Sequence, residues 1–322
     1  MKEVKIVSTG SYVPKKILDN EFLSSIVQTS DEWITTRTGI KKRHISNGEN
    51  TSDLAYEAAK RAIYDANIDP KSVEAVIVAT VTPDNFTPSV ACILQERLNL
   101  VNAACFDINA ACSGFLYALS VAASMIKGGL FSNALIVGAE VLTKVVDWQD
   151  RNTCVLFGDG AGAAFLKASQ EKGILNYFIA SDGSKGKLLK IPAVSVNNPF
   201  VSSFQPKPYV YMDGKEVFKF ATEVIVSSIE KVLKNSNLTL EDIDLIIPHQ
   251  ANIRIIEFAA KKLKLPLDKF YINIQNYGNT SAASIPIALD EALKRGVVKK
   301  GNKVVLVGFG GGLTWGAALI EM

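Results

Sequence analysis

One cysteine of this 322-residue chain has a sequence context that suits a nucleophile. Cys112 follows two alanines and precedes a Ser-Gly pair, where a strand-like run ends and the apolar helical run 115–121 begins. Small neighbours leave room for a substrate at the sulfur, and the N-terminal end of a helix favours thiolate. From these residues alone, a nucleophile and a buried core cysteine remain equally open. The other cysteines lie in apolar or strand-like runs and are predicted to fill the core: Cys92, Cys105 and Cys154.

Few side chains could assist such a nucleophile, because the chain has only two histidines, His44 and His249. His44 lies in a basic run, which favours a structural or solvated role. His249 follows the apolar run 245–248, and the carboxyl ends of such strands are where α/β proteins place their sites. Asn279 precedes a second helical run and, taken alone, is better explained as a helix cap.

The elements that would position these residues alternate between strand and helix. Short β-branched runs bounded by Gly, Pro or polar residues predict strands buried on both faces, and the runs between them predict helices. This order is typical of an α/β fold, and we expect largely parallel sheets. The expected strands are 75–80, 134–138, 244–248 and 303–308; the expected helices are 52–66, 114–127, 253–263 and 284–295.

The order of elements also repeats along the chain. Ile77 and Ile136 are 59 positions apart, as are Ile247 and Leu306, and a Gly-rich run follows each later strand. We therefore predict two similar halves, residues 1–170 and 171–322, that pack face to face.

This repeat relates the candidate residues to one another. It pairs Cys112 with Thr280 and His249 with Thr80, so that Cys112 and Asn279 would begin equivalent helices that converge from opposite halves. The Pro-rich segment 195–211 is predicted to be a surface excursion near the site.

Composition excludes several functional classes. A net charge of +3 is too small to indicate a nucleic-acid partner. No apolar run approaches the roughly 20 residues of a membrane-spanning helix, and the charged start resembles a strand, not a signal peptide. The cysteine spacing does not indicate a metal site, and no nucleotide-binding glycine motif is present. We expect a soluble cytoplasmic protein with no cofactor.

Four motifs, taken together, resemble the β-ketoacyl-acyl-carrier-protein synthase III family of the thiolase-like superfamily. They are Ala111–Phe115, Pro248–Asn252, Tyr277–Ser281 and Phe309–Trp315, and the resemblance covers essentially the whole chain. It implies an α/β fold of thiolase-like type, with five layers (αβαβα) and two duplicated halves, and a homodimer. It also implies an acyltransferase that starts type II fatty-acid synthesis. Such an enzyme condenses an acyl-CoA primer, with acetyl-CoA expected, with malonyl-acyl-carrier protein, and releases CO2 and CoA.

The same resemblance implies roles for individual residues. Cys112 would carry the acyl group, and the N–H groups of Cys112 and Gly311 would form the oxyanion hole. Decarboxylation leaves an enolate, which needs hydrogen-bond donors and no base that removes a carbon-bound proton. A neutral imidazole and an amide suit that need, so His249 and Asn279 complete the catalytic set.

Substrate residues follow from the resemblance and partly from the pattern itself. A capping box of Thr29 with Glu32 predicts a helix start there, which makes Trp33 and Arg37 neighbours one turn apart. In helical projection Arg254 and Lys261 lie close together, opposite an apolar face formed by Ile256, Ala259, Ala260 and Leu263. The resemblance assigns CoA and pantetheine binding to Thr29, Trp33, Arg37, Arg151, Gly214, Phe218 and Asn252; the end of the acyl pocket to Phe86; and carrier-protein binding to Gln250, Ala251, Asn252, Ile253, Arg254 and Lys261.

Two other functions stay open beside this one. A related ketosynthase or acyltransferase of secondary metabolism could use the same three catalytic residues. The second alternative is a non-catalytic partner subunit, and the presence of Cys112, His249 and Asn279 argues against it.

Overall fold

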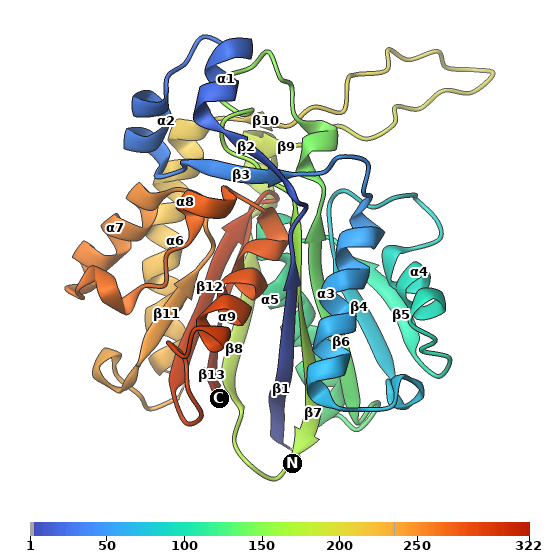
Figure 1. Ribbon diagram of the computed structural model, residues 1–322, viewed down its shortest axis with the longest axis vertical. Coiled ribbons are helices and arrows are strands. Elements are labelled where there is room, and N and C mark those ends of the chain that lie inside the picture. The colour runs from blue at the N-terminus through green and yellow to red at the C-terminus, as the bar shows by residue number, and fades with distance from the viewer. Residues whose placement is uncertain (1–2, 235) are drawn as a thin grey trace.

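The computed structural model describes residues 3–234 and 236–322, and two mixed sheets organise it (Figure 1). The first sheet has the strand order β1-β7-β6-β4-β5 and the second β11-β12-β13-β8. Their strands are β1 (Glu3–Tyr12), β4 (Ala75–Ala79), β5 (Ala104–Ile108), β6 (Asn133–Glu140), β7 (Gly160–Ser169), β8 (Ile174–Ser181), β11 (Leu245–Pro248), β12 (Lys303–Gly310) and β13 (Thr314–Glu321). Two ribbons, β2 (Lys16–Asp19) with β3 (Lys42–Ile45) and β9 (Leu189–Lys190) with β10 (Tyr211–Met212), lie outside them.

Helices cover both faces of both sheets, and each of the three helical layers packs on a sheet through its own apolar cluster. α3 (Thr51–Ala66) and α4 (Val90–Arg97) pack on one face of the first sheet. α5 (Gly114–Lys127) and α9 (Ser284–Lys294) fill the space between the two sheets. α6 (Gly214–Lys234) and α7 (Ile253–Leu263) cover the far face of the second sheet. The predicted five-layered arrangement is therefore confirmed.

Smaller helices complete the chain around these layers. α1 (Asn20–Ile26), α2 (Asp31–Thr38) and α8 (Ile274–Tyr277) lie at the end of the molecule where β4 and β11 finish (Figure 1). The 3₁₀ turns are η1 (Pro70–Ser72), η2 (Ala111–Ser113), η3 (Leu142–Val145), η4 (Gly183–Leu188), η5 (Leu240–Asp242), η6 (Leu267–Lys269) and η7 (Ser281–Ala283).

The repeat spacing corresponds to a physical pairing in each sheet. Ile77 of β4 lies opposite Ile136 of β6, and Ile247 of β11 lies opposite Leu306 of β12, both in parallel register. The equal spacing supports the division into halves 1–170 and 171–322, which stays a prediction; the chain passes from the first sheet to the second between Ser169 and Ile174.

The expected, largely parallel strand direction is confirmed. Among the described strands of the two sheets, β7 and β13 alone run against the others, and each pairs antiparallel with both of its neighbours. One expectation about the repeat is wrong, because the pairing of Cys112 with Thr280 is out of register. Ala111 and Ser281 share a left-handed φ of 46° and 48° and open the equivalent turns η2 and η7, which makes Ala282 the counterpart of Cys112.

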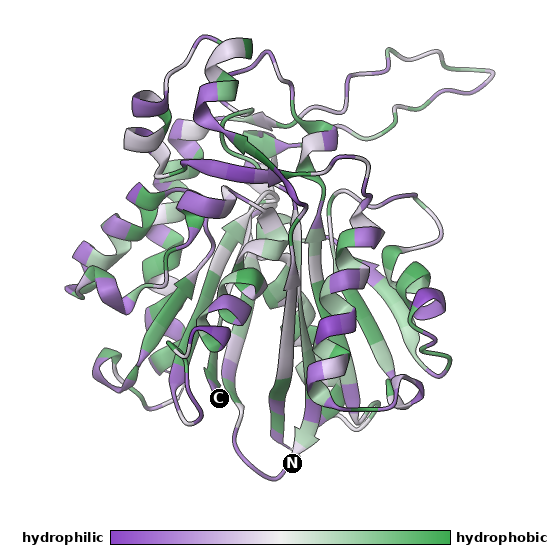
Figure 2. Cartoon of the chain, in the orientation of Figure 1, coloured by the Kyte–Doolittle hydropathy of each residue, from purple (hydrophilic) through white to green (hydrophobic). Residues whose placement is uncertain are grey.

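Hydropathy follows the layers. The strands of both sheets are predominantly apolar, whereas the outer helices alternate between apolar and polar residues (Figure 2). The segment 191–210, between β9 and β10, projects from the body of the molecule as the predicted excursion (Figure 1). Within the described ranges, none of the helices combines the length and the hydropathy needed to cross a membrane.

Candidate active site

A cavity of about 1480 Å³ opens at the carboxyl ends of the parallel strands and contains the predicted catalytic residues. Cys112, His249 and Asn279 all line it, although they come from three separate turns. Cys112 lies in η2 ahead of α5, His249 follows β11, and Asn279 precedes η7. Two central helices that begin at the same level thus bring groups from both halves to one point.

The backbone around Cys112 is held in an unusual conformation. Ala111 has a φ of 46°, a left-handed value that costs a non-glycine residue of order 1–2 kcal/mol. Gly310 lies directly against this turn, because a Cβ built there would come within 2.5 Å of the Cys112 nitrogen. The glycine run that ends β12 therefore lets the second half approach the nucleophile closely.

Burial dominates the chemistry of the Cys112 thiol. Burial raises the pKa of Cys112 to about 12; the neighbouring Ser281 opposes this shift, and the charge of Glu140 adds to it. The expectation that a helix N-terminus favours thiolate here is therefore wrong for the resting protein. The η2 turn separates the sulfur from α5, and desolvation outweighs the helix.

His249 is neutral in this structure. Its side chain is 2% exposed, and burial lowers its pKa to about 3. Nδ1 lies 2.6 Å from the Ser284 hydroxyl oxygen, and the edge of Phe309 packs against the ring at 5.4 Å between centroids. Both contacts fix the plane of the imidazole.

The amide of Asn279 is oriented by the turn that follows it. Its Oδ1 accepts a hydrogen bond from the Ser281 N–H at 2.8 Å, so Asn279 caps η7 from one residue before the N-cap position, which Thr280 occupies. Because the oxygen is used in this way, the NH2 group is the end of the amide left for the cavity. The Asn279 backbone pairs with 156 and 158, which anchors the turn. A cap and a donor are therefore compatible roles.

Two residues of this site have no counterpart in the sequence-based prediction. Ser284, which positions His249, lies 35 residues further along the chain, and no spacing pattern connects the two. Glu140 is fully buried at the end of β6 and accepts hydrogen bonds from both halves. A lone carboxylate that ends an otherwise apolar strand, 134–139, was the signal that could have identified it.

The residues predicted to hold the adenine (Trp33 and Arg151) and the phosphates (Arg37) of CoA lie together. Arg37 and Arg151 both stack on Trp33, with guanidinium carbons 4.8 Å and 5.1 Å from the ring centroid. Because two stacking gaps of about 3.5 Å each are needed for an inserted base, one arginine must move before a base can enter. The helix start is one residue later than predicted, since the N-cap of α2 is Ser30 and its side chain accepts from the Trp33 N–H. Thr29 therefore lies outside the helix.

The cavity extends to α6 and the start of α7, whereas Thr29, Trp33, Arg37 and Arg151 do not line it. Gly214, Phe218 and Asn252 line the cavity, and the Arg254 guanidinium lies 6.0 Å from the Phe218 ring. Asn252 is also the N-cap of α7.

The face of α7 is as predicted, with one correction. Arg254 and Lys261 are exposed, whereas Ile256, Ala259, Ala260 and Leu263 are buried. Ala251 and Ile253 are half-buried, and Ile253 packs against Gly39 at the end of α2. Gln250 is only 1% exposed, and its amide is bonded to backbone groups of the loop 271–274 and to the carbonyl of 248. Because the Gln250 side chain is buried against this loop, it cannot be part of a docking surface.

Phe86 lies at the rim of the same cavity. It is 86% exposed in the single chain, in a loop that also contributes Thr82 and Asp84 to the lining.

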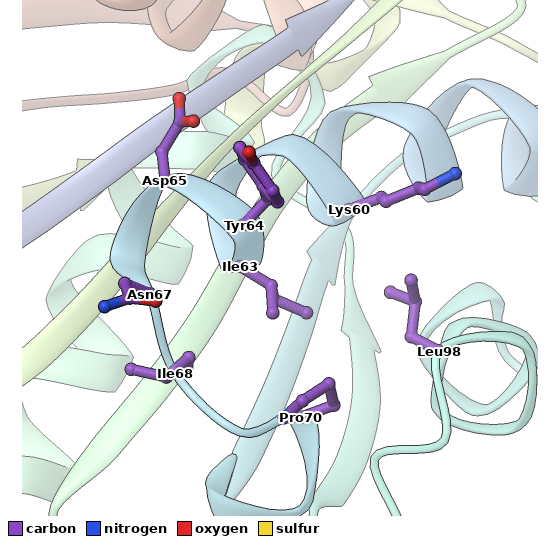
Figure 3. A pocket seen from close by; sticks show the side chains of 8 residues that line it. All are labelled: Lys60, Ile63, Tyr64, Asp65, Asn67, Ile68, Pro70 and Leu98. Atoms are coloured by element: carbon purple, nitrogen blue, oxygen red, sulfur yellow. The ribbon is translucent and has the colours of Figure 1, made fainter.

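A second, smaller pocket of about 640 Å³ lies at the end of α3, away from these residues (Figure 3). It contains no nucleophilic thiol or histidine, and its lining is Lys60, Ile63, Tyr64, Asp65, Asn67, Ile68, Pro70 and Leu98. The candidate catalytic residues Cys112, His249 and Asn279 line the large cavity and not this one. Among the described residues, no acidic, histidine or cysteine cluster has the makings of a metal site.

Comparison with known proteins shows the family to which the chain belongs. The family described as 3-oxoacyl-[acyl-carrier-protein (ACP)] synthase III matches residues 106–183, and its C-terminal part matches 233–322. The β-ketoacyl-[acyl-carrier-protein] synthase III of Clostridium acetobutylicum is 58% identical, over 100% of this chain and 99% of that protein.

Solved structures share the fold over the same length. The 3-oxoacyl-[acyl-carrier-protein] synthase III of Aquifex aeolicus superposes with a TM-score of 0.93 at 47% identity, covering 99% of this chain and 100% of that one. A priming β-ketosynthase from a polyketide biosynthetic pathway reaches 0.92 at 34% identity, covering 99% and 96%.

Proposed function

Because this chain belongs to the β-ketoacyl-[acyl-carrier-protein] synthase III family, we propose that it joins an acyl-CoA primer to malonyl-acyl-carrier protein through an acyl group carried on Cys112. Enzymes of this family are acyl-transferring condensing enzymes that initiate fatty-acid synthesis. The proposal adds the primer, acetyl-CoA, and the residues that perform each step.

In the loading step, the sulfur of Cys112 attacks the thioester carbon of acetyl-CoA. The carbon–sulfur bond to CoA breaks, and the thiol proton ends on the CoA sulfur, so no external base is consumed. The tetrahedral oxyanion would be held by the N–H groups of Cys112 and Gly311. The close approach of Gly310 to the Cys112 nitrogen supports this pairing, because it brings the backbone at the end of β12 next to the backbone of η2.

In the condensing step, malonyl-acyl-carrier protein loses CO2 and becomes an enolate. Its developing charge needs donors, which His249 and Asn279 supply as uncharged N–H groups. The enolate carbon then attacks the acyl group on Cys112, and collapse of that adduct releases the sulfur, which takes up a proton. The product is a β-ketoacyl thioester on the carrier protein.

The surroundings of His249 support the tautomer that this step needs. The Ser284 hydroxyl oxygen lies 3.4 Å from the Gln250 N–H, which leaves its own hydrogen to donate to Nδ1. The imidazole hydrogen then sits on Nε2, the nitrogen available for substrate. A pKa of about 3 keeps the ring neutral throughout the working pH range.

The remaining predicted sites become proposals on the same basis. Trp33, Arg37 and Arg151 would hold the adenine and phosphates of CoA, and Gly214, Phe218 and Asn252 the pantetheine arm. Arg254 and Lys261, with the half-buried Ala251 and Ile253, would meet the acidic carrier protein beside the cavity. Ile253 packs on Gly39 at the end of α2, which supports a carrier-protein surface that adjoins the proposed CoA site. We also propose a cytoplasmic homodimer, which would cover the exposed ring of Phe86.

The observation that carries the proposal is the convergence of Cys112, His249 and Asn279 on one cavity from both halves of the chain. Incubation with radioactive acetyl-CoA should label the wild type and the Cys154→Ala control at one acetyl group per chain, and leave Cys112→Ala unlabelled. Stoichiometric label on Cys112→Ala would show that another nucleophile is at work.

A polyketide-priming or other secondary-metabolite role is the second candidate, favoured by the 34% identical ketosynthase of that kind. Competition among acyl-CoA primers separates the two functions. Preference for acetyl-CoA with the carrier protein of fatty-acid synthesis supports the first. Preference for another acyl group, or for a different carrier, supports the second.

A further inference from the structure

Glu140 is a buried carboxylate that the mechanism above does not use. It is 0% exposed at the carboxyl end of β6, and its hydrogen-bond partners come from both halves of the chain. From the first half, the hydroxyls of Thr80 and Thr82 donate to it at 3.1 Å and 2.6 Å, and the Val81 N–H donates at 3.1 Å. From the second half, the Ser281 hydroxyl donates to its Oε1 at 3.1 Å. A buried charge is tolerated when it is bonded in this way.

The two oxygens of Glu140 have different partners. Oε2 accepts from the hydroxyls of Thr80 and Thr82, whereas Oε1 accepts from Ser281. Both threonine hydroxyl oxygens are themselves acceptors, for the N–H groups of Thr82 and Val141, so their hydrogens are committed to Oε2. An amide in place of the carboxylate would therefore keep its oxygen on the threonines and turn its NH2 group toward Ser281.

Ser281 connects this carboxylate to the amide of Asn279. Its N–H donates to Oδ1 of Asn279 at 2.8 Å, while its hydroxyl donates to Glu140. The φ of Ser281 is 48°, a left-handed value that is strained for a residue with a side chain. The bond to Glu140 therefore holds the turn in a conformation that the serine backbone alone disfavours, and this conformation aims the N–H at Asn279.

Close packing of β6 against η7 keeps these groups together. Gly138 lies two residues before Glu140 in the strand, and a Cβ built on it would overlap the carbonyl oxygen of Ala282. Ala282 directly follows Ser281 in η7, so the strand that ends at Glu140 is in contact with the turn that orients Asn279. The hydrogen bond between Ser281 and Glu140 therefore forms across closely packed backbone of both halves.

We propose that Glu140 is a positioning residue that fixes the orientation of the Asn279 amide by holding Ser281. This inference rests on the proposed donor role of Asn279 in malonyl decarboxylation. While Ser281 is held, its N–H occupies Oδ1 of Asn279, and the NH2 group is the end that meets the developing enolate. Loss of the bond to Glu140 lets the turn relax and the amide rotate, and an amide oxygen that faces the cavity repels the enolate oxygen.

The test compares the two half-reactions of Glu140→Gln in the whole protein at pH 8. One oxyanion donor is worth about 10²–10³ in rate, so a donor that is misdirected for most of the time should cost about tenfold in malonyl decarboxylation. Loading should not slow, because the charge of Glu140 raises the pKa of the Cys112 thiol and its removal leaves more thiolate. Release of labelled CO2 from malonyl-acyl-carrier protein measures the first step, and acetylation of Cys112 by labelled acetyl-CoA measures the second.

Three further variants show whether the effect is transmitted by Asn279. Ser281→Ala leaves the carboxylate and removes the link, so it should show the same difference between the half-reactions. In the Asn279→Ala background, Glu140→Gln should lower decarboxylation by less than about twofold, because the amide that it positions is absent. Asp290→Asn is the control, since it alters another buried carboxylate, bonded to the Thr9 hydroxyl, and should change neither step.

Equal slowing of both half-reactions in a folded Glu140→Gln protein, judged by near-ultraviolet circular dichroism, would overturn the proposal. An unchanged decarboxylation rate would overturn it as well, and so would a full additional loss in the Asn279→Ala background or the same difference in Asp290→Asn. If Glu140→Gln does not fold, Ser281→Ala decides by the same two rates. Failure of the proposed function itself is distinguishable, because the wild type would then neither accept acetyl on Cys112 nor release CO2 from malonyl-acyl-carrier protein.

Discussion

Substitution of Asn279 separates its role as a donor from its role as a cap. In the structure Oδ1 accepts the Ser281 N–H, and the NH2 group is left for the cavity. Asn279→Ala removes both functions, whereas Asn279→Asp keeps an acceptor for the Ser281 N–H and removes the donor. The pair therefore isolates the hydrogen bond to the substrate.

The expected loss follows from the value of one oxyanion donor. Removing such a donor costs about 10²–10³ in rate. Losing a cap costs about 0.5–2 kcal/mol of stability and no specific rate. Both variants should therefore lose malonyl decarboxylation by about 100-fold or more, and only Asn279→Ala should also lose several degrees of thermal stability. Acetylation of Cys112 should fall much less, because its oxyanion is held by backbone N–H groups.

Two assays on the same protein samples measure this. Release of labelled CO2 from malonyl-acyl-carrier protein reports the condensing half-reaction, and acetyl transfer to Cys112 reports loading. If Asn279→Asp decarboxylates at the wild-type rate while Asn279→Ala does not, the residue acts as a cap and the donor role is wrong. Equal loss of both half-reactions would also contradict the assignment.

Three further experiments test the substrate sites and the charge state of His249. Phe86→Ala should raise the ratio of kcat/KM for octanoyl-CoA to that for acetyl-CoA by roughly ten- to a hundredfold, the scale of a steric clash of ~1–3 kcal/mol; an unchanged ratio in a folded variant would place the end of the pocket elsewhere. Lys261→Glu and Arg254→Glu should raise KM for malonyl-acyl-carrier protein most at low salt, while Lys299→Glu, at the opposite end of β12, should not; a salt-independent change would refute a docking role. Because His249 is neutral when folded (pKa about 3) and would protonate near 6.5 when unfolded, its contribution to stability is lost as pH falls from about 6.5 toward 3. The unfolding free energy of the wild type relative to His249→Gln should therefore decrease by about 1.4 kcal/mol per pH unit in that window, measured by denaturant titration; a pH-independent difference would mean that the ring is charged in the fold.

Much of this architecture was predictable from local pattern. The helices at 114–127 and 253–263 have the bounds expected from their apolar periodicity, because each is long and buries one continuous face. The 59-residue spacing marked true strand partners, since a repeated strand–helix–strand unit must return to the same register. Strand direction was not predictable in the same way. β13 follows β12 after a short glycine turn, and nothing in its composition separates an antiparallel neighbour from a parallel one.

In the site, too, local motifs could be interpreted from the sequence, whereas contacts between distant segments could not. Cys112, His249 and Asn279 could be predicted as one catalytic set because each stands in a motif that resembles the family, whereas the residues alone left Cys112 open and favoured a cap for Asn279. Burial of Gln250 was not, because its partners lie in the loop 271–274 and only the tertiary fold brings them together. The raised pKa of Cys112 has the same origin, since desolvation depends on packing from both halves and outweighs the local helix end.

The most direct test of the central claim is a single-turnover experiment followed at the Cys112 peptide by mass spectrometry. Wild-type enzyme mixed with acetyl-CoA should show one acetyl group on Cys112 and none on the other cysteine peptides. Addition of malonyl-acyl-carrier protein should remove that group at the rate at which acetoacetyl-carrier protein forms. Product formation without an acetylated Cys112, or an acetyl group that persists while product accumulates, would contradict the account.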